Sequence, residues 1–368
     1  MRILIPTTAG RGHFLPIVPF AEALRKSGHE VLVAAPGSFR EAVEQTGLDV
    51  WPCADEAPDE SGEAFTSFAE RAPQALLPGV LAAIDSFRPH LILRDMAELA
   101  SLIAGVMRNV PQVQVLFGLG ETLGIVDRML PVVSAWSAAE GVDLDALMTA
   151  AGTQPTLSPL PESYDGLPPV PHGPIHRFSI PDAVHPRTAG DKPLVYLSFG
   201  TVSGAYPFGR PALHAAATAL ADLPIRLVVS LGGYNPEDAD TFLDRTGVRV
   251  EPWIHPAEEA RIIASADVVV GHGGAGTTLA CLRNGVPLVA VPLFGDQPLN
   301  AGRMEAAGVG LAVPLVDGKL DSPALIAAVS RVLDDPSFRE HSVLIAEAIA
   351  ALPPVSAAVP LLENLAKR

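Results

Sequence analysis

The feature that most constrains this chain is the segment 267–300, which reads DVVVGHGGAGTTLACLRNGVPLVAVPLFGDQPLN. It contains an apolar strand at Val268–Val270, a glycine-rich turn over residues 271–276, and a helix that opens at Thr277. A second apolar strand follows at Leu288–Val291. Strands that alternate with helices form parallel sheets covered on both faces. The segment therefore predicts an α/β fold.

The same turn is suited to bind phosphate. Glycines that lead into a helix N-terminus let backbone N–H groups converge on an anion, and the helix dipole favours its negative charge. His272 adds a side-chain donor to this turn. The glycines are not followed by Lys-Ser or Lys-Thr, and neither Lys nor Arg occurs between Asp267 and Arg283, so the segment is not a Walker P-loop. The pattern indicates a phosphate site of a protein other than an ATPase.

The remaining sequence repeats the alternation of strands and helices in two series. Residues 2–35 predict a β–α–β unit, and a helix is expected at about 323–334. The stretch from Leu157 to Asp191 is rich in proline, which is typical of an extended connection between domains. A chain of 368 residues is long enough for two domains with substantial cores. Further strands are expected at 91–93, 113–117, 194–197, 226–230 and 248–250.

Charge and cysteine content exclude several classes of protein. A formal net charge of −16 argues against nucleic acid or an anionic membrane surface as the partner. Cys53 and Cys281 lack metal-ligand spacing and fit a reducing compartment. The N-terminus has no apolar signal-peptide region, and no apolar run reaches the roughly 18–20 residues that a membrane span needs. We therefore expect a cytoplasmic protein with no membrane span, present as a monomer or homodimer.

A histidine follows the first strand in the turn GRGHFL, residues 10–15. This turn does not match the dinucleotide fingerprint, because Leu15 occupies the third glycine position and no acidic residue ends the second strand. His13 is expected at the carboxyl end of a strand, where open α/β sheets bind ligands. A neutral imidazole there can act as a general base near neutral pH. Taken alone, however, a histidine is more often a capping or core residue.

Several motifs that occur in order along the chain resemble those of a known family. They are GRGHFLP, LSFGT, PWIHP, HGGAGTT and PLFGDQPLNA, and together they extend over nearly the whole sequence. The set resembles nucleotide-sugar glycosyltransferases of the GT-B fold, of the antibiotic and macrolide type that is related to UDP-glycosyltransferases. The resemblance implies two Rossmann-like, doubly wound domains that face each other across a cleft. It implies an acceptor-binding domain at 1–187, a donor-binding domain at 188–352, and a C-terminal segment, 353–368, that packs back on the first domain.

The resemblance assigns chemistry to residues of the first domain. His13 is implied to be the general base, and Asp95 to bind its other ring nitrogen, as the carboxylate of a Ser-His-Asp triad does. Arg94 is adjacent to Asp95, so a surface arrangement of these two charges is an open alternative, and Glu98 is the second candidate for the carboxylate. The apolar stretch from Phe117 to Trp136 is the expected acceptor pocket, which suits an aromatic or polyketide-like aglycone.

In the second domain the resemblance implies a site for a nucleotide-diphosphate sugar. The turn after strand 194–197 would contact phosphate or sugar, although turn formation alone explains the same residues. Trp253 would stack on the nucleobase, with core packing as the alternative. Asp296 and Gln297 would bind sugar hydroxyls, with an N-cap by Asp296 as the alternative. The implied donor-binding residues are Gly12, Ser198, Gly200, Thr201, Trp253, Ile254, His272, Gly274, Gly276, Thr277, Asp296 and Gln297.

The implied reaction is an inverting, metal-independent transfer of a sugar from a TDP- or UDP-sugar to a hydroxyl, or a carbon, of a hydrophobic small molecule. No cofactor is expected, since no Asp-x-Asp pair or His/Cys cluster is placed for a metal. Plant-type members of the family carry a glutamate eight residues after the histidine that corresponds to His272. This chain has Ala280 at that position, so it binds the ribose differently. The rival interpretations are a GT-B sugar-nucleotide isomerase or phosphorylase, and a catalytically silent nucleotide-sugar-binding regulator.

Overall fold

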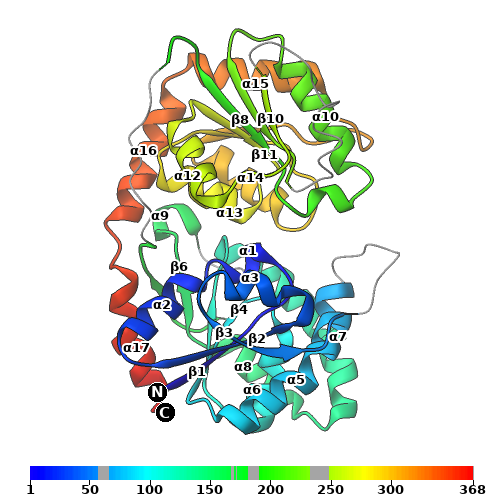
Figure 1. The fold of residues 1–368 in the computed structure, drawn as a ribbon, viewed down its shortest axis with the longest axis vertical. Coiled ribbons are helices and arrows are strands. Elements are labelled where there is room, and N and C mark those ends of the chain that lie inside the picture. The colour runs from blue at the N-terminus through cyan, green and yellow to red at the C-terminus, as the bar shows by residue number, and fades with distance from the viewer. Residues whose placement is uncertain (57–65, 167–169, 171, 181–189, 233–247, 368) are drawn as a thin grey trace. The chain divides into compact units, whose positions relative to one another are not determined.

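The structure is a computed structural model that describes residues 1–56, 66–166, 170, 172–180, 190–232 and 248–367. The chain divides into two compact units, which are Met1–Pro181 with Leu352–Arg368, and Asp182–Ala351. The expected domain boundary between residues 187 and 188 lies outside the described residues. Each unit is built on one parallel sheet with helices on both faces (Figure 1). None of the described helices is long and apolar enough to cross a membrane.

The first unit contains a seven-stranded sheet in the order β3-β2-β1-β4-β5-β6-β7. All neighbouring strands are parallel. The chain builds outward from β1 on one side and from β4 on the other, so the strand order reverses between them. Open α/β sheets bind ligands at such a reversal, beyond the carboxyl ends of the strands. The strands are β1 (Arg2–Pro6), β2 (Glu30–Pro36), β3 (Asp49–Cys53), β4 (Leu91–Asp95), β5 (Gln112–Val115), β6 (Thr156–Ser158) and β7 (Ile175–Arg177).

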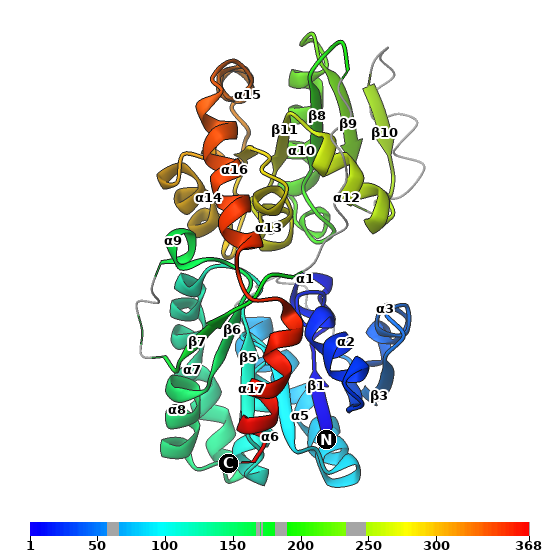
Figure 2. The ribbon, with the colours of Figure 1, turned by 90° about the vertical axis from the view of Figure 1, so that its left-hand side faces the viewer.

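Two groups of helices cover this sheet. Helices α2, α3 and α17 contribute to the core on one face, and α5 to α8 contribute to the core on the other (Figure 2). The helices are α1 (Arg11–Phe14), α2 (Val18–Lys26), α3 (Arg40–Glu44), α5 (Ala72–Phe87), α6 (Leu99–Arg108), α7 (Leu123–Ser137), α8 (Leu144–Thr153), α9 (Glu162–Asp165) and α17 (Ala358–Leu365). Short 3₁₀ turns lie at Gly37–Phe39, Gly120–Thr122, Ala138–Glu140 and Val355–Ala357, and a π-helical turn lies at Ser67–Arg71.

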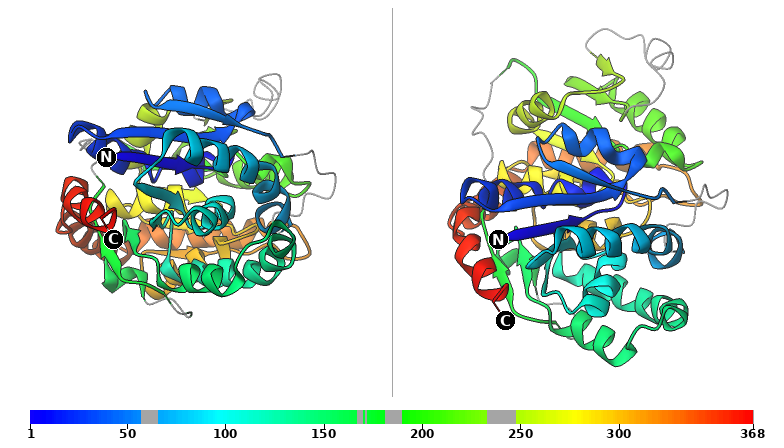
Figure 3. Two further views of the ribbon diagram at one scale, coloured as in Figure 1. Left: turned by 90° about the horizontal axis from the view of Figure 1, so that it is seen from below. Right: turned by 60° about the horizontal axis from the view of Figure 1, so that its bottom comes forward.

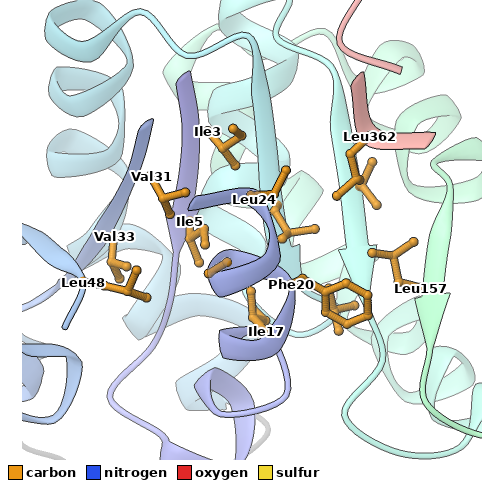
Figure 4. Packing of buried hydrophobic residues seen from close by; sticks show 14 of the residues in the cluster. Ile3, Ile5, Ile17, Phe20, Leu24, Val31, Val33, Leu48, Leu157 and Leu362 are labelled. Carbon is orange, nitrogen blue, oxygen red and sulfur yellow. The ribbon is translucent and has the colours of Figure 1, made fainter. Parts of the chain in front are cut away.

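The alternation of side chains along β1 explains the two cores. Ile3 and Ile5 point to the face covered by α2, where they pack in one cluster with Phe20 and Leu24 (Figure 4). Leu4 belongs to the cluster on the opposite face. Successive side chains of a strand point to opposite faces, so a fully buried strand is apolar throughout.

Both chain ends lie in the first unit (Figure 3). The His29 imidazole joins them, because Nδ1 lies 3.0 Å from the amino group of Met1 and Nε2 lies 3.0 Å from Oε1 of Glu363 in α17. The C-terminal segment also contributes Leu362 to the same core cluster as Ile3 and Ile5 (Figure 4). The last residues of the chain are therefore a structural part of the N-terminal unit.

The second unit contains a six-stranded parallel sheet in the order β10-β9-β8-β11-β12-β13. Its strand order reverses between β8 and β11. The strands are β8 (Leu194–Ser198), β9 (Arg226–Ser230), β10 (Val248–Glu251), β11 (Val268–Gly271), β12 (Leu288–Ala290) and β13 (Gly310–Ala312). The helices are α10 (Gly209–Leu220), α12 (Pro256–Ser265), α13 (Ala275–Arg283), α14 (Gln297–Ala306), α15 (Ser322–Asp334) and α16 (Ser337–Ala350), with a 3₁₀ turn at Ser203–Ala205.

The expected fold class of two doubly wound α/β domains is confirmed by these sheets. The sequence pattern did not predict β3, β6, β7 or β13. Strand β3 is an edge strand that contains Pro52, and the other three strands have only three residues each. Such strands carry little periodic signal, and proline is tolerated in a sheet mainly at its edge.

We expect Phe20→Ala to lower the free energy of unfolding by about 3–5 kcal/mol, because it leaves a cavity in a close-packed core. Phe20 is 1% exposed, and its ring centroid lies 6.0 Å from that of Phe178. Urea denaturation followed by circular dichroism measures the change. Met148→Ala on α8 is the control, since Met148 is 46% exposed and its truncation should change stability by less than about 0.5 kcal/mol. Equal losses for the two variants would contradict this account of the core.

Candidate active site

The first unit brings His13 and Asp95 together at the reversal of its strand order. His13 lies in α1, which follows β1, and Asp95 is the last residue of β4. His13 Nδ1 lies 3.2 Å from Asp95 Oδ1, and the two side chains are 21% and 1% exposed. Because an ionised carboxylate only accepts hydrogen bonds, Nδ1 carries the proton and the basic lone pair of the neutral imidazole is on Nε2.

The Asp95 carboxylate is held in a compact turn. Its Oδ1 also accepts a 2.6 Å hydrogen bond from the backbone N–H of Ala97. Its Oδ2 is buried and makes no hydrogen bond to the described residues. A buried carboxylate with unused acceptor capacity beside an imidazole stabilises the protonated ring, because the opposite charge favours the imidazolium.

The alternative of a surface arrangement of Arg94 and Asp95 is wrong, because both side chains are buried. Arg94 Nη1 donates to the backbone carbonyls of Asp95, Met96 and Glu98, so the guanidinium holds the turn that carries Asp95. The Glu98 carboxylate accepts from the backbone N–H of Ser101 and caps α6. Burial raises the pKa of Glu98 and lowers that of Arg94. The structure therefore pairs His13 with Asp95, and Glu98 has a capping role.

Two half-buried aromatic rings flank His13. Its ring centroid lies 4.6 Å from that of Phe117 and 4.9 Å from that of Phe68. Phe117 begins the expected acceptor stretch, whereas Phe68 was not predicted. Phe68 lies in the π-helical turn Ser67–Arg71, which Trp136 supports by donating from Nε1 to the Ala69 carbonyl. No motif marks Phe68 in the sequence, so only the tertiary structure places it beside His13.

In the second unit, Gly200 after β8 and Gly274 of the glycine-rich turn both lie against the His272 ring. A Cβ atom at Gly200 would lie 2.9 Å from His272 Cε1, and one at Gly274 would collide with Nε2. Gly200 also has φ +70°, a conformation that favours glycine. His272 Nδ1 is buried and makes no hydrogen bond to the described residues. Burial lowers the pKa of His272 to about 4, so the ring is neutral near pH 7.

Helix α13 begins directly after this turn, and no side chain of the described residues accepts a hydrogen bond from the backbone N–H groups of its first turn. Gly274 is its N-cap residue, no side chain caps it, and its first turn contains no acidic residue. The N–H groups of the first turn of a helix have no intrahelical acceptor. A Cβ atom at Gly276 would meet nothing within 4 Å, so the helix start is open to an approaching group. The arrangement can hold a phosphate group.

The other predicted donor residues have different environments. Trp253 is 44% exposed, so core packing is not its role, whereas the neighbouring Ile254 is buried. His255 accepts from the Ala257 N–H and caps α12. Ser198 Oγ accepts from the Gly200 N–H, which is the turn chemistry that the alternative interpretation expected. Thr201 in the second unit and Gly12 in the first unit are exposed, and Thr277 in the first turn of α13 is half-buried.

The structure gives the side chains of Gln297 and Asp296 defined partners and rejects the N-cap alternative for Asp296. Gln297 Oε1 accepts from the backbone N–H groups of Leu293 and Phe294, so Gln297 can offer a ligand its amide nitrogen and not its oxygen. Asp296 occupies the N-cap position of α14 but makes no side-chain cap hydrogen bond. Its Oδ2 accepts from Asn300 Nδ2 instead. Among the described residues, no group of three or more His, Cys, Asp or Glu side chains could hold a metal ion.

Comparison with known proteins identifies the family. Residues 182–356 match the family model "UDP-glucoronosyl and UDP-glucosyl transferase". The chain is 30% identical to L-demethylnoviosyl transferase of Streptomyces niveus, over 95% of this chain and 98% of that protein. The chain belongs to the antibiotic-type glycosyltransferases of the GT-B fold.

Solved structures agree with this family assignment. The glycosyltransferase resembles a spinosyn rhamnosyltransferase complexed with thymidine diphosphate, with a TM-score of 0.80 and 24% identity over 99% of this chain and 100% of that one. It also resembles a glycosyltransferase of Streptomyces sp. SF2575 complexed with thymidine diphosphate, with a TM-score of 0.76 and 25% identity over 99% of each chain. The expected fold class and enzyme class are thus confirmed.

The low pKa of His272 predicts an acid-sensitive stability. The neutral ring contributes its full stabilisation above about pH 6.5, and this is lost as the pH falls toward the folded-state pKa of about 4. The slope from one such group is at most about 1.4 kcal/mol per pH unit. We expect His272→Asn to lose less stability than wild type over this range in urea denaturation. His214→Asn, at an exposed position of α10, is the control, and identical pH slopes for wild type and His272→Asn would refute the prediction.

Proposed function

We propose that this glycosyltransferase moves a sugar from TDP to a hydroxyl of a hydrophobic natural-product aglycone, with inversion at the anomeric carbon and with His13 as general base. The observation that carries the proposal is the hydrogen bond between His13 and the buried Asp95 at the carboxyl edge of the first sheet. It leaves the imidazole in the tautomer that a base requires. The aromatic rings of Phe68 and Phe117 beside His13 favour an apolar acceptor.

The proposed step is a single displacement. His13 Nε2 takes the proton of the acceptor hydroxyl while the oxygen forms a bond to the anomeric carbon. The bond between that carbon and the diphosphate oxygen breaks, and its electron pair leaves with the diphosphate. Asp95 stabilises the resulting imidazolium, as the carboxylate of a catalytic triad does.

The leaving diphosphate gains negative charge, which the start of α13 is suited to stabilise. Free N–H groups fixed at a helix N-terminus provide this stabilisation without reorganisation during the reaction. The neutral His272 ring can add a hydrogen bond through the one N–H that it carries. We therefore propose that no metal ion is needed, and the assays below contain EDTA so that they test this point together with turnover.

We expect His13→Ala to reduce transfer by roughly 10²–10⁴-fold, the usual contribution of a general base, and to leave the affinity for TDP unchanged. Transfer from TDP-glucose to a panel of aromatic polyketide and phenolic aglycones is followed by mass spectrometry, and TDP affinity by calorimetry. His214→Ala is the matched control, because this exposed histidine lies on α10. If His13→Ala keeps more than about a third of wild-type turnover, His13 is not the base.

The preference for TDP is a separate proposal about the ribose. Ala280 in α13 occupies the position of the plant-type glutamate and cannot accept a hydrogen bond from ribose hydroxyls through its side chain. A site that binds a hydroxyl with a buried acceptor rejects the analogue that lacks it, and a site without that acceptor has no such reason to reject it. The TDP complexes of the similar structures support the same choice.

We expect wild type to use TDP-glucose at least as well as UDP-glucose, and Ala280→Glu to shift kcat/KM toward UDP-glucose. Competition between the two donors measures the ratio directly. Ala350→Glu, at an exposed position at the end of α16, controls for the added charge. A wild-type preference for UDP-glucose of about tenfold or more would overturn the proposal.

A further inference from the structure

Asn300 is a buried polar residue of the PLFGDQPLNA motif for which the sequence predicts no role. It lies in α14, is 2% exposed, and uses its amide nitrogen for two hydrogen bonds. Nδ2 donates to the backbone carbonyl of Gly273 at 2.8 Å and to Asp296 Oδ2 at 2.7 Å. Both amide hydrogens of this side chain are therefore used inside the second unit.

The two acceptors belong to different parts of the candidate donor site. Gly273 lies in the turn that leads into α13, with φ +77°, and Asp296 precedes α14. The two segments are in close contact, because a Cβ atom at Gly273 would lie 3.2 Å from the backbone carbonyl of Gln297. Asn300 thus joins the phosphate turn to Asp296, the carboxylate that the family resemblance implies to bind sugar hydroxyls.

The chemistry of the two acceptors explains why an asparagine stands here. A backbone carbonyl and an ionised carboxylate both need a donor, and a primary amide supplies two N–H groups from one nitrogen. A serine hydroxyl supplies only one, and an ionised aspartate supplies none. An uncharged side chain also adds no positive or negative charge next to the site of the leaving diphosphate.

We propose that Asn300 is a positioning residue that fixes the Asp296 carboxylate relative to the phosphate turn. The sugar and the diphosphate would then be held at one separation while the bond between them breaks. This inference rests on the proposed function, because it takes Asp296 as a sugar contact and the turn as a phosphate contact. Asn300 does not itself touch the substrate.

The test compares Asn300→Asp with Asn300→Ala. Asn300→Asp keeps the shape of the side chain but removes both donors and places a second carboxylate against Asp296. We expect kcat/KM for TDP-glucose to fall by about tenfold or more, since hydrogen bonds to charged groups are lost, and the affinity for free TDP, which does not depend on Asp296, to fall by a clearly smaller factor. Hydrolysis or transfer of TDP-glucose gives the first value and calorimetry the second.

The pH dependence separates positioning from packing. Two adjacent carboxylates raise the pKa of one of them, and a protonated carboxyl group can donate the missing hydrogen bond. The activity of Asn300→Asp relative to wild type should therefore rise as the pH falls from about 8 to about 6. Asn300→Ala has no such group, so its relative activity should stay low across this range.

Asn284→Asp is the matched control. Asn284 also donates from Nδ2 to a backbone carbonyl, that of Ala280 at 2.8 Å, but it lies at the other end of α13. We expect its kcat/KM to stay within about twofold of wild type. Thermal melts of all variants identify any loss of folding. If one of the two Asn300 variants does not fold, the other is compared with wild type alone.

Three outcomes would overturn the inference. They are wild-type kcat/KM in both Asn300 variants, a deficit in Asn300→Asp that does not change with pH, and a loss of free TDP affinity as large as the loss in kcat/KM. Each of them requires that wild type consumes TDP-glucose. If wild type neither transfers nor hydrolyses any TDP-sugar, the proposed function itself fails, so the two failures are distinguishable.

Discussion

The parallel arrangement of strands is the constraint on which both candidate sites depend. In a parallel sheet every strand ends at the same edge, so the loops after neighbouring strands meet there. In the first unit this edge receives His13 after β1 and Asp95 from β4, although the two residues are 82 positions apart. In the second unit it receives Ser198 at the end of β8 and His272 after β11. The fold therefore determines at which edge of each sheet polar side chains can meet, whatever residue types the loops carry.

In the second unit, glycines at that edge leave the space that the His272 ring occupies. The His272 ring has a glycine on two sides, and a side chain at either position would occupy the space of the ring. The enclosed ring stays neutral because burial disfavours its charged form. A neutral imidazole carries one N–H, so it can act as a single donor beside the open start of α13. The glycine-rich turn is thus needed for the environment of the histidine as well as for the approach of a phosphate group.

The sequence predicted the parts of these sites that are local in the chain. The turn before α13, the histidine after β1 and the aspartate at the end of β4 follow from strand ends and short motifs. Phe68, the burial of Arg94 and the orientation of Gln297 could not be predicted in this way. Each depends on a neighbour that only the folded chain supplies, such as Trp136 for the turn that carries Phe68. Short strands and proline-containing edges, such as β3, were missed for the related reason that packing stabilises them more than their own periodicity does.

Each of the two units has a buried donor that supports the segment carrying an aspartate. In the first unit Arg94 donates to three carbonyls of the turn that begins with Asp95, and in the second Asn300 donates to Asp296 and to Gly273. Both donors are buried, so removing either leaves buried acceptors without a partner, which costs more than the hydrogen bond itself contributes. A carboxylate at the end of a strand or before a helix would otherwise have several accessible rotamers. Asn300 donates to the Asp296 carboxylate itself, whereas Arg94 fixes the backbone turn from which the Asp95 carboxylate projects toward His13. In both units a buried donor thus helps to give the carboxyl edge of the sheet a defined geometry.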